Sequence, residues 1–257
     1  MFQLARHASL VAMLMLALAP ATLLAQSDGA TRDSIYDSAA QLLAQGRANE
    51  ARILLLRAMR ASNDPAQIAE YRLHVGDSFL YDGQYDEAAR AYRAVLDRGH
   101  VSPTSAAARE AHHGLALVDA FDGRSARAAT HYAEVLRGGT LRDTVEMLVM
   151  TNQNDSAQKA LDRLAASSSD PQTRQYVPAF RGLSWMMAGH CTQALPEIAK
   201  APQQDRPIPV AVRGRCAMKH GQRPEALVLK DAVLKQPATD PFSWTVLIAR
   251  DAARKIE

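Results

Sequence analysis

The sequence holds three sets of residues whose types could support chemistry: a Gly-Asp-Ser block, eight histidines and two cysteines. In the block Gly76-Asp77-Ser78, the serine could act as a nucleophile only beside a general base and an oxyanion hole. The surrounding pattern predicts that Ser78 lies within a helix, and no histidine follows His220 in the chain to serve as a late base. We therefore predict that the protein is not an enzyme and has no catalytic residue.

The eight histidines do not form a metal-ligand pattern. His112 and His113 are adjacent, so on a helix their side chains point about 100° apart. His74 and His113 could converge from neighbouring helices, but no carboxylate stands at a spacing that would complete a metal site. We expect the histidines on helix surfaces, and we predict neither a metal nor a cofactor.

The two cysteines, Cys191 and Cys216, are 25 positions apart, a spacing that matches no metal-binding motif. Two interpretations are open at this point. A disulfide would close the loop between them and stabilise the fold by about 3 kcal/mol; alternatively, both are buried free thiols. We favour the disulfide because the start of the chain indicates an oxidising compartment.

The first 25 residues have the layout of a secretory signal peptide. A short basic start is followed by an apolar run, a break at Pro20 and small residues at Ala21 and Ala25. Cleavage is expected after one of these two alanines, which predicts an exported protein, either periplasmic or secreted. The alternative is an uncleaved membrane anchor, although a span needs about 20 apolar residues and Pro20 interrupts this shorter run.

The composition favours helices over sheets. The 257 residues include 48 alanines and only 5% aromatic residues, whereas sheets are rich in aromatic and β-branched residues. The net charge is only +3, which gives no electrostatic reason to expect binding to nucleic acid or to an anionic membrane.

An internal repeat organises most of the chain. About every 35 positions, a turn residue is followed five positions later by alanine and then, four positions on, by a larger residue. Glycine and, less readily, asparagine adopt the left-handed conformation that ends a helix, so the pattern predicts two helices joined by a tight turn. The turn residues are Gly46, Gly83, Gly123, Asn152 (a weaker copy), Gly189 and Gly221, and the alanines are Ala51, Ala88, Ala128, Ala157, Ala194 and Ala226.

Small residues also occur in the first helix of several units. Gly76, Gly182 and Gly214 would let the second helix approach closely, while the third unit has Ala116 at this position. Proline-containing dipeptides such as Asp64-Pro65 mark the unit ends, because the residue before a proline avoids the helical conformation.

The second unit resembles the tetratricopeptide repeat. Val75-Gly76 with Phe79, then Gly83, Ala88 and Tyr92, follow that family's order of glycine, aromatic, alanine and aromatic residues. The resemblance covers about residues 32–239, although the consensus tryptophan is missing throughout. It implies an all-α, right-handed α-solenoid of about six helix-turn-helix units. The final segment, 242–256, is expected to be a capping helix whose Arg250, Arg254 and Lys255 face solvent.

We assign residues 1–25 to the signal peptide and 26–257 to the solenoid. The fourth unit is short, with a truncated first helix near 144–150, and it follows Gly138-Gly139. Two sub-solenoids, 26–139 and 140–257, are therefore an alternative organisation.

The resemblance also implies a function, which is the binding of another protein or peptide in a concave groove lined by the first helices. Mapped onto this chain, the groove holds Tyr36, Leu43, Leu73, Asp77, Leu80, Tyr81, His113, Leu117, Phe121, Leu183, Met186, Met187, Arg215 and Met218, with Glu70 and Glu110 near its edge. Methionines adapt to varied partners, but packing is the favoured interpretation of Met186 and Met187. The alternative function is self-association as a scaffold of an envelope assembly. No transmembrane segment is expected once the signal is removed.

Overall fold

The computed structural model describes residues 19–97, 101–168, 170–203, 206–235 and 240–257, and this part of the chain is all helical, without a strand. Its thirteen helices form six consecutive hairpins and a final single helix, as expected for a solenoid. The helices are α2 (Ala19–Ala44), α3 (Ala48–Ala61), α4 (Pro65–Asp82), α5 (Tyr85–Leu96), α6 (Ala106–Phe121), α7 (Ser125–Leu136), α8 (Leu141–Met150), α9 (Asn154–Ser167), α10 (Pro171–Met187), α11 (Cys191–Ala199), α12 (Pro207–Lys219), α13 (Arg223–Lys235) and α14 (Trp244–Arg254).

The turns and alanines of the repeat lie where the sequence predicts. The six hairpin turns have positive φ angles, at Gly46, Gly83, Gly123, Asn152, Gly189 and Gly221. At Gly83, for example, the Gly83 and Gln84 amides donate to the carbonyls of Leu80 and Phe79 in the last turn of α4, which satisfies groups that a helix end leaves free. The six repeat alanines are 0% exposed. The hairpin fold class is therefore confirmed.

The glycines of the first helices allow close packing between helices. A Cβ atom built on Gly76 would lie 2.5 Å from the Tyr92 ring, and one on Gly182 would lie 2.5 Å from Ile198. In the third unit, Gly114 packs against the same Tyr92 ring, while Ala116 is 0% exposed. Tyr92 thus lies between glycines of two successive units, an arrangement that a unit-by-unit comparison misses.

The fourth unit is short in its first helix, as predicted. α8 has only 10 residues, and a capping box between Thr140 and Asp143 fixes its start. α7 nevertheless contacts α8, and α8 contacts both α9 and α10. The division into two sub-solenoids stays a prediction.

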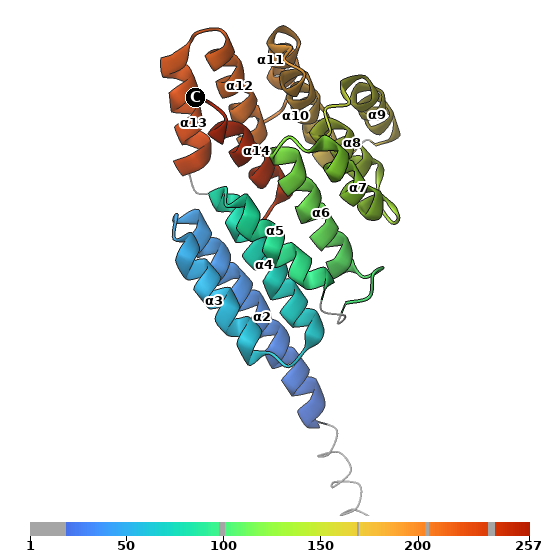
Figure 1. The fold of residues 1–257 in the computed structure, drawn as a ribbon, viewed down its shortest axis with the longest axis vertical. Helices are drawn as coiled ribbons and strands as arrows, with labels where there is room; N and C mark the ends of the chain where they lie inside the picture. Colours follow the sequence, from blue (N-terminus) through green and yellow to red (C-terminus); the bar gives the residue numbers. More distant parts are fainter. Residues whose placement is uncertain (1–18, 98–100, 169, 204–205, 236–239) are drawn as a thin grey trace, which may run out of the picture.

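The hairpins follow one another around a curve, so that the last one comes back toward the first half of the chain (Figure 1). α14 lies inside this curve, where it contacts α12, α13 and also α4. The prediction that its basic residues face solvent is wrong for Arg250, which is 7% exposed. The reason is that backbone carbonyls of α4 and α13 accept hydrogen bonds from this side chain.

Covalent and terminal features complete the fold. A disulfide joins Cys191 at the start of α11 to Cys216 in α12, with the two Cα atoms 5.4 Å apart. The described N-terminus begins with α2, which runs through Ala21 and Ala25, and most of the predicted signal peptide, residues 1–18, lies outside the described residues. Within the described part, every helix is too short or too polar to cross a bilayer.

Candidate functional site

The predicted groove is partly covered by the chain's own C-terminal segment. The predicted groove residues that are buried in the first three units are Leu43, Leu73, Asp77, Leu80, Tyr81, His113, Leu117 and Phe121. Among them, Tyr81 and Phe121 contact α14 or the residue that follows it: Arg250 stacks 3.6 Å from the Tyr81 ring centroid, and Lys255 lies 5.8 Å from that of Phe121. This half of the concave face is therefore closed within the molecule.

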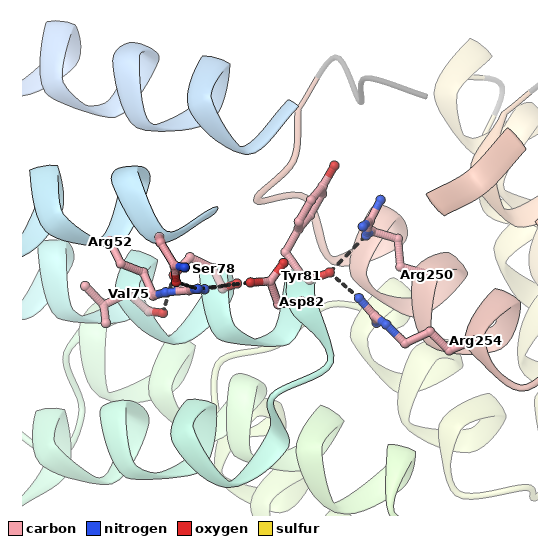
Figure 2. A network of polar contacts seen from close by, with 8 residues as sticks. Arg52, Val75, Ser78, Tyr81, Asp82, Arg250 and Arg254 are labelled. Atoms are coloured by element: carbon pink, nitrogen blue, oxygen red, sulfur yellow. Dashed lines mark hydrogen bonds and ion pairs between the residues drawn. The ribbon is translucent and has the colours of Figure 1, made fainter. Parts of the chain in front are cut away.

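Two arginines attach α14 to the end of α4 (Figure 2). Arg250 donates from Nε to the Tyr81 carbonyl at 3.0 Å, and Arg254 donates to the same oxygen and to the Leu80 carbonyl. The last carbonyls of a helix carry partial negative charge, so they are favourable partners for guanidinium groups. Burial lowers the pKa of Arg250, and its three carbonyl partners offset the loss of water around the charge.

Further hydrogen bonds join α14 and the residue after it to α5 and to α6 of the third unit. The Tyr85 hydroxyl donates to Asp251 at 2.7 Å, and Lys255 donates to the Phe121 carbonyl at 2.8 Å. Burial raises the pKa of Tyr85, and the charge of Asp251 raises it further. Tyr85 therefore stays a hydroxyl donor at neutral pH, and α14 is held by helices from two units.

The start of α14 covers a buried polar cluster. His113 in α6 is hydrogen bonded to Glu146 in α8, the Tyr132 hydroxyl donates to the same carboxylate at 3.1 Å, and Trp244 lies 4.4 Å from the His113 ring. Burial lowers the pKa of His113, but Glu146 outweighs that effect and raises it overall. The expectation that the histidines lie on helix surfaces is thus wrong for His113, which is 7% exposed because a carboxylate from the next unit pairs with it.

A pocket of about 760 Å³ lies beside α14, at the N-terminal end of the concave face. Its walls come from α2, α4, the segment before α6, the first turns of α6, and residues 240–244. Of the predicted groove residues, Tyr36, Leu73 and Asp77 line it. Glu70 and Glu110, which were expected near the groove edge, also line it.

Aromatic side chains form one wall of this pocket. The rings of Tyr36, His74 and Phe242 lie within 5.1 Å of one another, centroid to centroid. The Tyr36 hydroxyl also contacts Asp240 at 3.4 Å, and burial together with Asp240 raises the pKa of Tyr36 to about 12. Residues more than 200 positions apart therefore build this wall jointly.

Carboxylates line the same pocket with few basic partners. Asp77 accepts a hydrogen bond from Tyr92 at 2.7 Å and contacts His74 Nδ1 at 3.1 Å. Burial raises the pKa of Glu110 and is the largest effect; His113 lowers it, Asp77 raises it, and Arg109 and a hydrogen bond from Trp244 lower it, so that the pKa is raised overall. The surroundings of Glu110 therefore compensate its negative charge only in part.

The predicted groove residues of the C-terminal half lie away from this pocket. Leu183 and Met186 are buried in the core, which favours the packing interpretation for Met186, and Met187, Arg215 and Met218 are half-buried. Within the described residues, no group of His, Cys, Asp and Glu has a geometry that could hold a metal ion.

Ser78 is a structural residue of α4 (Figure 2). It is 0% exposed, and its hydroxyl donates to the Val75 carbonyl at 2.7 Å within the helix. Its own carbonyl accepts a hydrogen bond from Arg52 at 3.1 Å. A serine in this position is not accessible to a substrate.

Three pocket residues of the C-terminal segment, Asp240, Phe242 and Trp244, are not among the residues predicted from the sequence. The available signal was the apolar character of this last segment, which was assigned to capping the end of the solenoid. The basic residues on its other side have the pattern of a solvent-facing surface. Their backbone carbonyl partners cannot be identified from a sequence, because every residue has a carbonyl.

Comparison with known proteins gives structural likeness but no sequence match. No protein-family profile and no curated protein sequence matches the chain. A tetratricopeptide repeat protein from Parabacteroides merdae has a similar structure, with 12% sequence identity, coverage of 87% of this chain and 99% of that chain, and a TM-score of 0.42. Independently of this likeness, the hairpin turns, repeat alanines and first-helix glycines described above define a solenoid of helical hairpins. The chain is an all-α solenoid of six tetratricopeptide-like hairpins with a C-terminal helix packed inside the curve.

Proposed function

We propose that this protein is a non-enzymatic interaction module that binds a segment of a partner protein in the pocket beside α14. The observation that carries the proposal is the pocket itself, which has about 760 Å³ and combines apolar walls with polar groups. Binding sites commonly have this size and mixture. Three residues of the predicted concave groove, Tyr36, Leu73 and Asp77, line this pocket.

The mechanism is the burial of partner side chains in a pre-formed site, without bond chemistry. The walls are helices of three adjacent units, fixed by the α14 attachments, so little ordering is needed when the partner binds. An affinity in the micromolar range, about 8 kcal/mol, is expected for a short segment.

A pair of photo-crosslinking variants tests this proposal. Ala106 lies in the first turn of α6, is exposed and lines the pocket, whereas Ala126 lies in the first turn of α7, is exposed and is not among the pocket residues. With a photoreactive residue at each position in the native host, we expect a discrete adduct from position 106 and none from position 126. Equal crosslinking at both positions, or none at 106, would contradict the assignment of the site.

We also propose that the protein is exported. The signal-like first 25 residues and the Cys191–Cys216 disulfide support this, because disulfides persist in oxidising compartments. Intact mass measured on the protein from the envelope and the culture medium should show loss of residues 1–21 or 1–25. A full-length mass from the cytoplasm alone would refute export.

Self-association is the second candidate, and no specific observation favours it. The large hydrophobic residues that are exposed in the described chain are Ile53, Leu227 and Val228, on two helices far apart in the sequence. Such scattered residues are normal for a monomer surface. Light scattering that gives a concentration-independent monomer would agree with the interaction-module proposal.

A further inference from the structure

The pocket beside α14 differs in charge from the protein as a whole. The chain carries a net charge of +3, yet five carboxylates line this pocket and none of its described lining residues is Lys or Arg. The five are Asp64, Glu70, Asp77, Glu110 and Asp240. A concave site lined by one sign of charge concentrates ligands of the opposite sign.

Hydrogen bonds and one exposed ion pair position several of the pocket carboxylates. Asp240 accepts hydrogen bonds from the Phe242 amide at 3.2 Å and from the Tyr36 hydroxyl at 3.4 Å, and Asp77 accepts one from the Tyr92 hydroxyl. Glu70 has Arg32 at 3.8 Å, with both side chains exposed, and such a pair compensates little charge. Asp77 is buried and also contacts His74 Nδ1 at 3.1 Å, whereas Asp64 and Asp240 are exposed, so the negative charge of these two is accessible to a ligand.

The aromatic wall has a matching preference. Tyr36 and Phe242 of this wall, together with Trp244, line the same pocket as Glu110 and Asp240. The faces of aromatic rings attract ammonium and guanidinium groups within about 6 Å. Apolar lining residues such as Leu73 and Ala69 can pack along the aliphatic stem of a long basic side chain.

These features together define the class of partner. We propose that the pocket binds a basic segment of a partner protein and takes a Lys or Arg side chain between the aromatic wall and the carboxylates Glu110 and Asp240. This inference rests on the proposed function and specifies its ligand. The excess of carboxylates is a property of this pocket. Elsewhere on the surface, carboxylates pair with basic side chains, for example Glu50 with Arg47.

The test is selection of binders from a random nonapeptide phage library by the chain without residues 1–25, followed by fluorescence anisotropy with the selected peptides. We expect enrichment of Lys or Arg at one or two positions and an affinity that decreases as salt is added. Replacing the selected basic residue by norleucine should weaken binding about tenfold or more.

Variants of the protein locate the charge that is recognised. Glu110→Gln and Asp240→Asn keep an oxygen acceptor and the size of each side chain, and each should weaken the basic peptide about tenfold. The matched control is Glu225→Gln, an exposed carboxylate in the first turn of α13, which should bind as the parent protein does. Circular dichroism checks that all three variants are folded.

The outcomes separate this inference from the proposed function. Peptides that bind in the pocket, as judged by loss of affinity in Trp244→Ala, but show no basic enrichment would overturn the inference and leave the interaction module intact. Selection of no peptide, or of peptides whose binding is unaffected by Trp244→Ala, Glu110→Gln and Asp240→Asn, would overturn both.

Discussion

Removal of the Arg250 side chain should release α14 from the concave face. Arg250 is 7% exposed and donates three hydrogen bonds, to the carbonyls of Tyr81 at 3.0 Å, Val233 at 3.2 Å and Leu234 at 2.9 Å. Hydrogen bonds to charged groups contribute about 1.5–3 kcal/mol each, and a buried guanidinium loses hydration in return. Allowing for that cost, we expect Arg250→Ala to destabilise the folded state by about 3 kcal/mol.

Two measurements check this expectation. In thermal unfolding, about 3 kcal/mol corresponds to a midpoint lower by roughly 6–12 °C for a chain of this size. Because a solenoid can unfold in parts, hydrogen exchange is the sharper assay. Exchange should increase in 244–254 and at the end of α4, and it should stay unchanged in α9.

The control is Arg90→Ala, whose side chain is 67% exposed and pairs with Glu87 at 3.0 Å. This exposed pair should contribute less than about 1 kcal/mol. If Arg250→Ala has the same midpoint as Arg90→Ala, and exchange in α14 is unchanged, then the arginine does not attach α14 and the reasoning fails.

Three further predictions follow from single features. Burial raises the pKa of Glu110 above its usual 4.5, so the charged form of this side chain destabilises the fold. Glu110→Gln should therefore raise the unfolding midpoint at pH 7, and the difference from the parent protein should disappear below pH 4.5. A midpoint difference that stays constant across pH would contradict the raised pKa. Cys191→Ser with Cys216→Ser should lower stability by about 3 kcal/mol under oxidising conditions, measured in urea, and reductant should remove the difference from the parent. Residues 140–165, which include the 10-residue α8, should exchange fastest among the hairpins, and strongest protection there would refute this.

The hairpins could be predicted from the sequence because their determinants are local. Gly83 needs only its own backbone geometry to end a helix, and Ala88 is 0% exposed in α5, the helix that packs against α4 of the same unit. Asn152 shows the same logic, since it adopts φ of 57° in place of a glycine.

The closure of the concave face could not be predicted, because it joins residues far apart in the chain. Arg250 and Tyr81 are 169 positions apart, and the acceptor is a backbone carbonyl that any residue could supply. In sequence, a row of basic residues on one side of a helix has the pattern of a solvent-facing surface. Charged substitutions at Leu80 would therefore disrupt the core, where this side chain is 0% exposed, and would not report on partner binding.

The pocket could be predicted from the sequence only in part. Tyr36, Leu73 and Asp77 follow from the repeat register, which places them on first helices. The wall contributed by Phe242 and Trp244 follows only from the return of the C-terminal segment.

The most direct test of the account uses Trp244 as a reporter of pocket occupancy. The sequence has two tryptophans, so Trp185→Phe leaves Trp244 alone, next to Glu110 in the pocket lining. On titration with a selected basic peptide, we predict a saturable change in Trp244 emission with the same dissociation constant as the anisotropy measurement, weakened about tenfold by Glu110→Gln. Peptide binding that leaves Trp244 emission unchanged and is indifferent to Glu110→Gln would show that partners bind elsewhere on the solenoid.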